Sequence, residues 1–172
     1  MAAVVDIREW NGTSGSETAT SKTSGTIRFK SADNANFDLN DPIVRPGSGI
    51  ERSYEKFLRL RIGDPGPTSG ITYPRAFSDG AKPIPAWDGI EMYAGGIGAY
   101  ATPANTDSGV AATDFFSYTS GSPLDLGVFN TGSYSGTNTD IADYLVMQAD
   151  VIPAAAPGLT VTETLTIAYD ET

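Results

Sequence analysis

Oxygen-bearing side chains recur at every second position in one short stretch of the chain, at Asn34, Asn36, Asp38 and Asn40. Calcium-binding loops begin this way, because alternate residues direct carboxylate and amide oxygens at one cation. Two positions depart from that pattern. Leu39 stands where the sharp turn requires Gly, and Arg45 stands where the bidentate Glu belongs. The stretch therefore predicts an Asx-rich loop, and we expect no metal site.

Carboxylates are the other residues that could carry out chemistry. Glycoside hydrolysis needs only two of them, and the chain has 21 Asp and Glu residues. Asp140 and Asp143 flank the start of a predicted strand, and Glu163 interrupts an otherwise apolar row. Turn and sheet-rim positions account for all three. We predict no catalytic residue and expect no enzyme activity.

The chain contains no His and no Cys. This excludes a Ser-His-Asp triad, an imidazole base, a His-ligated zinc, thiolate chemistry, iron–sulfur clusters and disulfides. We expect no cofactor.

Six aromatic residues lie in or beside predicted loops, namely Tyr73, Trp87, Tyr93, Tyr100, Tyr118 and Tyr134. Aromatic rings at such positions suit stacking against sugars, which leaves a carbohydrate-binding module as one open function. Packing over the ends of a β-sandwich is the alternative, and we favour it.

The charges are distributed unevenly along the chain. The formal net charge is −10, and every Lys and Arg lies at or before Lys82. Nucleic acid is not an expected partner, because binding to phosphates needs a surplus of cations. The asymmetry suggests that the end of the molecule that carries the cations contacts an acidic protein, although a solvated acidic surface is a sufficient alternative.

Short apolar rows with a period of two, separated by Gly- and Pro-rich turns, indicate strands. The clearest rows are residues 53–62, 89–94, 143–151 and 159–169, and a half-buried strand is expected around Ile27 and Phe29. Prolines at 65, 67, 74, 83 and 85 predict an ordered loop or an edge region over residues 63–88. No amphipathic helix stands out. The predicted fold class is all-β, an antiparallel β-sandwich.

The first 24 residues differ in composition from the rest. Residues 2–10 are β-branched and aromatic, which indicates a strand or an extended arm, whereas residues 11–24 are small and polar. We predict an extended N-terminal arm and a flexible segment over residues 1–24, and a sandwich domain over residues 25–172. The arm would anchor itself on a neighbouring subunit through Val4, Val5, Ile7 and Trp10.

Three segments between residues 50 and 172 form a set with a characteristic order and spacing. They are residues 53–60 (SYEKFLRL), residues 89–93 (GIEMY) with Tyr100–Pro103, and residues 155–158 (AAPG) with residues 165–171 (LTIAYDE). Together they resemble a loosely defined group of tailed-bacteriophage virion proteins. The resemblance implies a non-enzymatic β-sandwich of the immunoglobulin-like or jelly-roll kind that serves as a capsid decoration (cement) protein. A tail, neck or fibre component is the alternative it leaves open.

The resemblance also implies partners and a location. The major capsid protein or other virion proteins are the expected partners, together with further copies of this chain, and no membrane is expected. The start of the chain lacks the features of a signal peptide, so we expect assembly in the host cytoplasm and a final place on the capsid surface. Four cations would pair with acidic capsid residues if they are exposed, namely Arg52, Lys56, Arg59 and Arg61.

Overall fold

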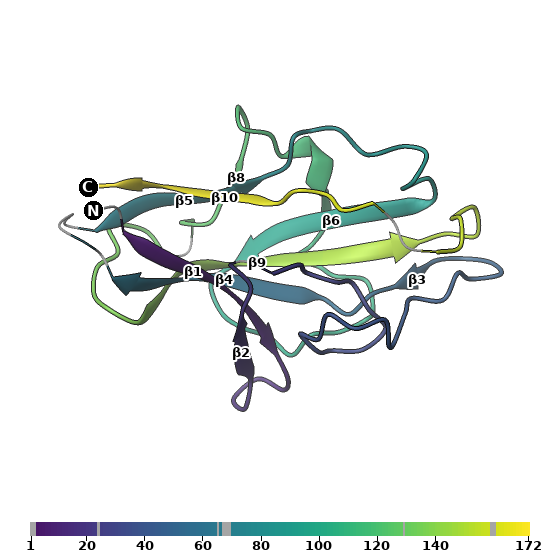
Figure 1. The fold of residues 1–172 in the computed structure, drawn as a ribbon, viewed down its shortest axis with the longest axis horizontal. Helices are drawn as coiled ribbons and strands as arrows, with labels where there is room; N and C mark the ends of the chain where they lie inside the picture. Colours follow the sequence, from purple (N-terminus) through teal and green to yellow (C-terminus); the bar gives the residue numbers. More distant parts are fainter. Residues whose placement is uncertain (1–2, 24, 65, 67–69, 129, 159–160) are drawn as a thin grey trace.

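The computed structural model describes residues 3–172, except residues 24, 65, 67–69, 129 and 159–160. Two antiparallel sheets pack face to face as a sandwich, which confirms the predicted fold class. Figure 1 shows β5, β8 and β10 in one layer and β1, β4, β6 and β9 in the other. Among the described residues the one helical turn is a 3-10 turn, η1 (Phe115–Ser117).

The larger sheet has the strand order β2-β1-β4-β9-β6-β7, with β3 paired to β9. Its strands are β1 (Val4–Asn11), β2 (Thr18–Ser21), β3 (Glu51–Arg52), β4 (Lys56–Asp64), β6 (Ile90–Ile97), β7 (Thr113–Asp114) and β9 (Thr139–Val151). The smaller sheet has the order β10-β5-β8, with β5 (Ile71–Phe77), β8 (Leu124–Asp125) and β10 (Thr166–Glu171).

The core lies between the two sheets. Leu58, Leu145 and Met147 of the larger sheet face Ala76 and Leu126 across the sandwich. The smaller sheet is short, and irregular segments cover the rest of the core. Ile27, Phe29 and Ile43, which all precede β3, pack against the same core. The expected strand around Ile27 and Phe29 is therefore wrong as secondary structure, although both side chains are partly buried as the alternation predicted.

The N-terminal arm is the main correction to the sequence analysis. Val4–Asn11 is strand β1, which lies between β2 and β4 in the larger sheet. Its register on β4 runs from Val4 opposite Asp64 to Trp10 opposite Phe57. The polar residues 11–24 contain β2 and the turn that joins it to β1. On the side away from β4, β2 pairs with Arg8–Asn11, and Ile7 exchanges hydrogen bonds with Lys22 N and Thr23 Oγ1, so β1 is held in the sheet of its own chain and does not project as an arm. Residues 1–2 of the predicted arm lie outside the described residues.

Residues 63–88 hold a second correction, because β5 is the central strand of the smaller sheet. Pro74 lies inside it and cannot donate a ladder hydrogen bond. The register against β10 shifts between Ala168 and Asp170, so the ladder is irregular beside Pro74. On the other side the Pro74 carbonyl accepts a hydrogen bond from Leu126 N at 2.8 Å. An irregular ladder therefore admits a proline that the sequence pattern reads as a strand breaker.

Candidate functional site

The site begins with two charged residues that interrupt apolar rows. Leu58, Leu60 and Ile62 of β4 point into the sandwich, and Lys56 continues that row with a positive charge. Val5 and Ile7 of β1 pack into the same core, and Glu9 continues their row with a negative charge. Because the interruptions fall on neighbouring strands at the same end of the sandwich, the two charges meet. The Lys56 Nζ lies 2.8 Å from Glu9 Oε1, and both side chains are 1% exposed.

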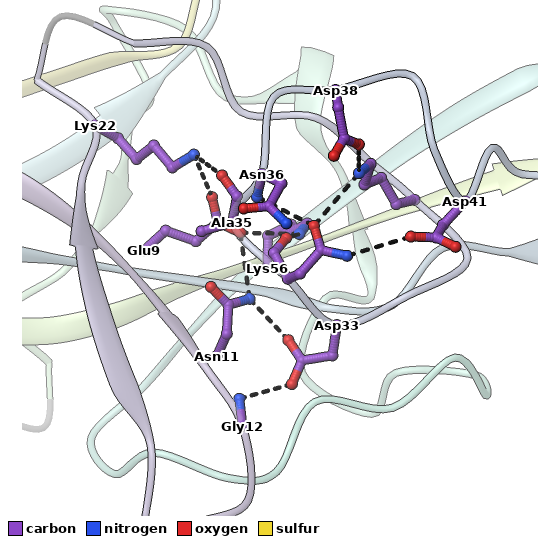
Figure 2. Close-up of polar contacts among 12 residues, drawn as sticks. Glu9, Asn11, Gly12, Lys22, Asp33, Ala35, Asn36, Asp38, Asp41 and Lys56 are labelled. Carbon is purple, nitrogen blue, oxygen red and sulfur yellow. Dashed lines mark hydrogen bonds and ion pairs between the residues drawn. The ribbon is translucent and has the colours of Figure 1, made fainter.

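A second lysine joins this pair. Lys22, which directly follows β2, places its Nζ 3.3 Å from Glu9 Oε2, and Figure 2 shows both lysines directed at the one carboxylate. Both also donate to the loop above them: Lys56 to the Asn34 carbonyl at 2.7 Å, and Lys22 to the Ala35 carbonyl. The Glu9 cluster, as we call Glu9, Lys22 and Lys56, thus ties the sheet to residues 34–35.

That loop, residues 31–41, contains the regular spacing of Asn and Asp. The side-chain oxygens of Asn34 and Asp38 each accept a backbone N–H two residues further on, which makes two Asx turns. The same oxygens converge on the ammonium group of Lys30, which is 1% exposed. A lysine therefore takes the place that a cation has in a calcium loop. Its hydrogen bond is the main cause that holds the pKa of Asp38 below the usual value.

The Asx loop and the residues after it carry exposed apolar side chains. Phe37 is 57% exposed, Leu39 is 65% exposed and Val44 is 70% exposed, and Ile50 is also exposed. We call residues 37–50 the apolar segment. Its start is fixed because the Arg28 guanidinium lies over the Phe37 ring, and Arg45 contacts the Ala155 carbonyl further along. The segment has no strand, yet buried cations hold the loop from which it begins.

The apolar residues of the predicted arm are mostly used inside the chain. Val5 and Ile7 pack against the core cluster around Leu60 and Ile62, and Trp10 packs on the outer face of the sheet against Tyr144. Val4 is the exception, since 60% of it is exposed. The sequence analysis grouped these residues as one anchor, but β1 directs them to different faces of the sheet.

The predicted basic contacts are also engaged within the chain. Arg52 pairs with Asp150 at 3.4 Å and with Asp107 at 3.6 Å, and Arg61 pairs with Asp140 at 3.4 Å. The Arg59 guanidinium lies over the Tyr144 ring and donates to the Ala142 carbonyl. Lys56 is buried, so the condition of exposure fails for it.

The fold offsets part of the charge asymmetry of the sequence. Arg52 and Arg61 from the first half find their acidic partners in the second half, as does Arg75, which pairs with Asp170 at 3.0 Å. Folding brings the cation-bearing half of the chain against the acidic half. These three arginines therefore do not form the basic end that we expected to dock onto an acidic partner.

Most of the aromatic residues pack against the body of the sandwich. Trp87 packs edge-on against Phe116 and donates to the Val161 carbonyl, and the Tyr100 hydroxyl donates to the Gly12 carbonyl. Burial raises the pKa of the Tyr100 hydroxyl. Tyr93 differs, because it borders a polar cavity of about 390 Å³ together with Arg52 and Asp107.

Asp140 and Asp143, two of the carboxylates singled out in the sequence, make different contacts. Asp140 pairs with Arg61, whereas buried Asp143 accepts hydrogen bonds from the backbone and side chain of Asn130. In the part of the chain that the structure describes, no group of three or more Asp and Glu side chains comes together as a metal site would require. The same part holds no helix that is both long and apolar enough to cross a membrane.

Sequence reasoning missed the buried charged residues as a group. Lys22, Lys30 and Glu9 were not singled out, and Lys56 was read as a surface contact. A signal was present, because opposite charges interrupted the apolar rows of two segments that both read as strands. The pairing of those segments was what the sequence lacked.

Comparisons of this chain with protein-family models, with curated proteins and with solved structures gave no match. The likeness to virion proteins accordingly stays a prediction from the sequence.

Proposed function

We propose that this chain is a non-enzymatic structural protein of a bacteriophage virion, and that it decorates the capsid by binding the major capsid protein. The observation that supports this most is the apolar segment, residues 37–50, held from below by buried cations. Exposed Phe37, Leu39 and Val44 on an anchored loop are what a protein-binding surface needs. Anchoring lowers the entropy that binding would otherwise cost.

The geometry moves the proposed contact away from the N-terminus. Val5, Ile7 and Trp10 are committed to the sheet, and Arg52 and Arg61 are paired within the chain. The apolar segment instead presents side chains with no such commitment to the core, such as Leu39 and Val44. We therefore assign the capsid contact to residues 37–50, with apolar burial as its main driving force.

Binding to purified, empty, expanded heads tests this proposal. The double variant Leu39→Ser with Val44→Ser should bind about tenfold more weakly or worse, because it removes apolar contact from the interface. The matched control is Ile84→Ser with Val128→Ser, which changes two equally exposed apolar residues outside the segment. The control should bind like the wild type.

Other outcomes separate the alternatives. Rings or trimers of the purified chain without head binding would favour a tail, neck or fibre component. Binding to polysaccharides without head binding would favour a carbohydrate-binding module, with Tyr93 and the cavity beside it as the place to mutate. Equal head binding by both double variants would remove the apolar segment as the contact.

A further inference from the structure

Three chemically complementary side chains are buried together at the end of the sandwich. They are the amine of Lys56, the carboxyl group of Glu9 and the carboxamide of Asn11, whose residues are 0%, 1% and 6% exposed. An amine and a carboxamide can condense to an amide when a proton carrier lies between them. The anchoring of residues 34–35 uses Lys56 and Glu9 but gives no role to Asn11.

One carboxylate oxygen contacts both reacting groups. Glu9 Oε1 lies 2.8 Å from the Lys56 Nζ and accepts a hydrogen bond from the Asn11 Nδ2 at 3.3 Å. The amine and the nitrogen that would leave are thus separated by a single oxygen atom. The Asn11 Oδ1 is buried and has no hydrogen-bond partner among the described residues, so none of them holds the carbonyl in place by a hydrogen bond.

The surroundings of Lys56 are those of a lysine nucleophile. Lys22 brings a second amine to the same carboxylate, at 3.3 Å from Glu9 Oε2. A lysine that is shielded from water and lies next to another cationic group is a recognised nucleophile in covalent chemistry. Asp33 is a further charged group here, and it accepts a hydrogen bond from the Asn11 Nδ2 at 2.7 Å.

We propose that Lys56 and Asn11 condense to an intramolecular isopeptide bond, with Glu9 as the proton carrier. Glu9 takes a proton from the Lys56 ammonium, and the free amine forms a bond to the Asn11 Cγ. The Cγ–Nδ2 bond then breaks. The two protons lost from Nζ pass through Glu9 to Nδ2, which leaves as ammonium beside Asp33. One C–N bond forms, one C–N bond breaks, and no oxidant or cofactor is needed.

The bond would join β1 to β4 and close the chain from residue 11 to residue 56. A chain without Cys has no disulfide to supply such a tie, and a covalent link that closes a long loop stabilises a fold mainly by restricting the unfolded chain. This inference does not depend on the proposed capsid contact, because the reacting groups lie under the loop and away from its exposed side chains.

Mass spectrometry of the denatured wild-type protein tests the inference directly. The intact chain should weigh one ammonia less than its sequence. Trypsin should then release residues 9–22 joined to residues 53–59, with no cleavage after Lys56 because its amine is blocked. Fragmentation should place the link between Lys56 and Asn11.

The peptide map is needed because Asn11 precedes Gly12, and a succinimide at that pair would also lose one ammonia. A succinimide leaves the two peptides separate and Lys56 cleavable, so that result overturns the inference. So does a folded wild-type chain of full mass, or a link to any other residue.

Variants identify the proton carrier. Lys56→Arg and Glu9→Gln should both abolish the joined peptide. Lys30→Arg is the matched control, since Lys30 is an equally buried lysine that contacts Asn34 and Asp38 instead, and it should retain the joined peptide. A joined peptide in Glu9→Gln at the wild-type yield would remove Glu9 from the reaction. The wild-type result stands as the primary test if a variant does not fold.

Discussion

At the scale of single residues, the buried ion pairs explain why charged residues interrupt the apolar rows of β1 and β4. Glu9 is 1% exposed and has lysine partners on two sides. A buried charge is tolerated only while its partners are present, because transfer from water costs several kcal/mol per ion. The Glu9 cluster is therefore a place where small changes have large effects.

Measured in an Asn11→Ala background, in which the proposed bond to Lys56 cannot form, Glu9→Ala should lower the free energy of unfolding by about 3–5 kcal/mol, since it leaves two buried lysines without their shared anion. Urea unfolding followed by circular dichroism measures this. The control is Asp107→Ala, whose side chain is 86% exposed although it also pairs with a cation. It should cost at most about 1 kcal/mol. Similar losses in the two variants would mean that burial does not set the cost.

Asp150 gives a prediction about pH. Burial raises its pKa above the usual value of 3.8, and this outweighs the attraction of Arg52. A raised pKa in the folded state means that the protonated form is favoured by folding, so the contribution of Asp150 is complete below 3.8 and is lost as the pH rises. Asp150→Asn should therefore raise the Tm at pH about 7, by an amount that shrinks towards pH about 4.

Thermal melts of the wild type and of Asp150→Asn between pH about 4 and pH about 7 test this prediction. Asp140→Asn makes the same change on the same strand, at a carboxylate that is less buried and also faces an arginine. It should give no comparable gain at neutral pH. A lower Tm for Asp150→Asn at pH about 7 would show that the ion pair with Arg52 outweighs the burial cost.

At the scale of elements, the first strand decides whether the sandwich forms. β1 supplies the partner for one side of β4 and places Val5 and Ile7 in the core. Without it, β4 would expose an unpaired edge and the inner row of its side chains.

Deletion of residues 1–10 should therefore abolish the cooperative unfolding transition of the chain, and loss of near-UV circular dichroism measures it. A detachable arm predicts the opposite, namely a truncated chain that melts near the wild-type temperature. Since the deletion removes a sheet strand, Val4→Ser is the better probe of any contact made by this end, because Val4 is 60% exposed.

At the scale of the whole molecule, folding forms ion pairs between the two halves of the chain. Arg52, Arg61 and Arg75 contact acidic residues from beyond position 83. The two ends of the described chain also meet, since the Ala3 amide donates to Glu171 Oε1 at 2.7 Å, and Figure 1 shows them at the same end of the sandwich. The molecule carries a net charge of −10, with much of its positive charge already engaged.

Capsid binding should accordingly depend little on salt. Between about 0.05 M and about 0.5 M NaCl we expect the Kd to change by less than about threefold, because apolar burial and not ion pairing drives the proposed contact. Titration of labelled protein onto heads at several salt concentrations measures this. A loss of affinity of about a hundredfold over that range would restore the charged docking surface that the sequence suggested.

Local sequence patterns were enough to predict the fold class and several strands, because the period of two and the turn residues are local properties. Residues 56–62 and 143–151 are examples whose faces could be assigned before any pairing was known. It also predicted an Asx-rich loop, and the structure contains two Asx turns there.

Tertiary structure alone decided which strands are neighbours, and with that the meaning of the charges. In the sequence, Lys56 only interrupts an apolar row, and the structure shows that it pairs with Glu9. The N-terminal residues were predicted to form an arm, and the structure shows that they pair with β4. Strand order is a long-range property that no local period encodes. The burial of a charge depends on that order, because only the neighbouring strand can supply its partner.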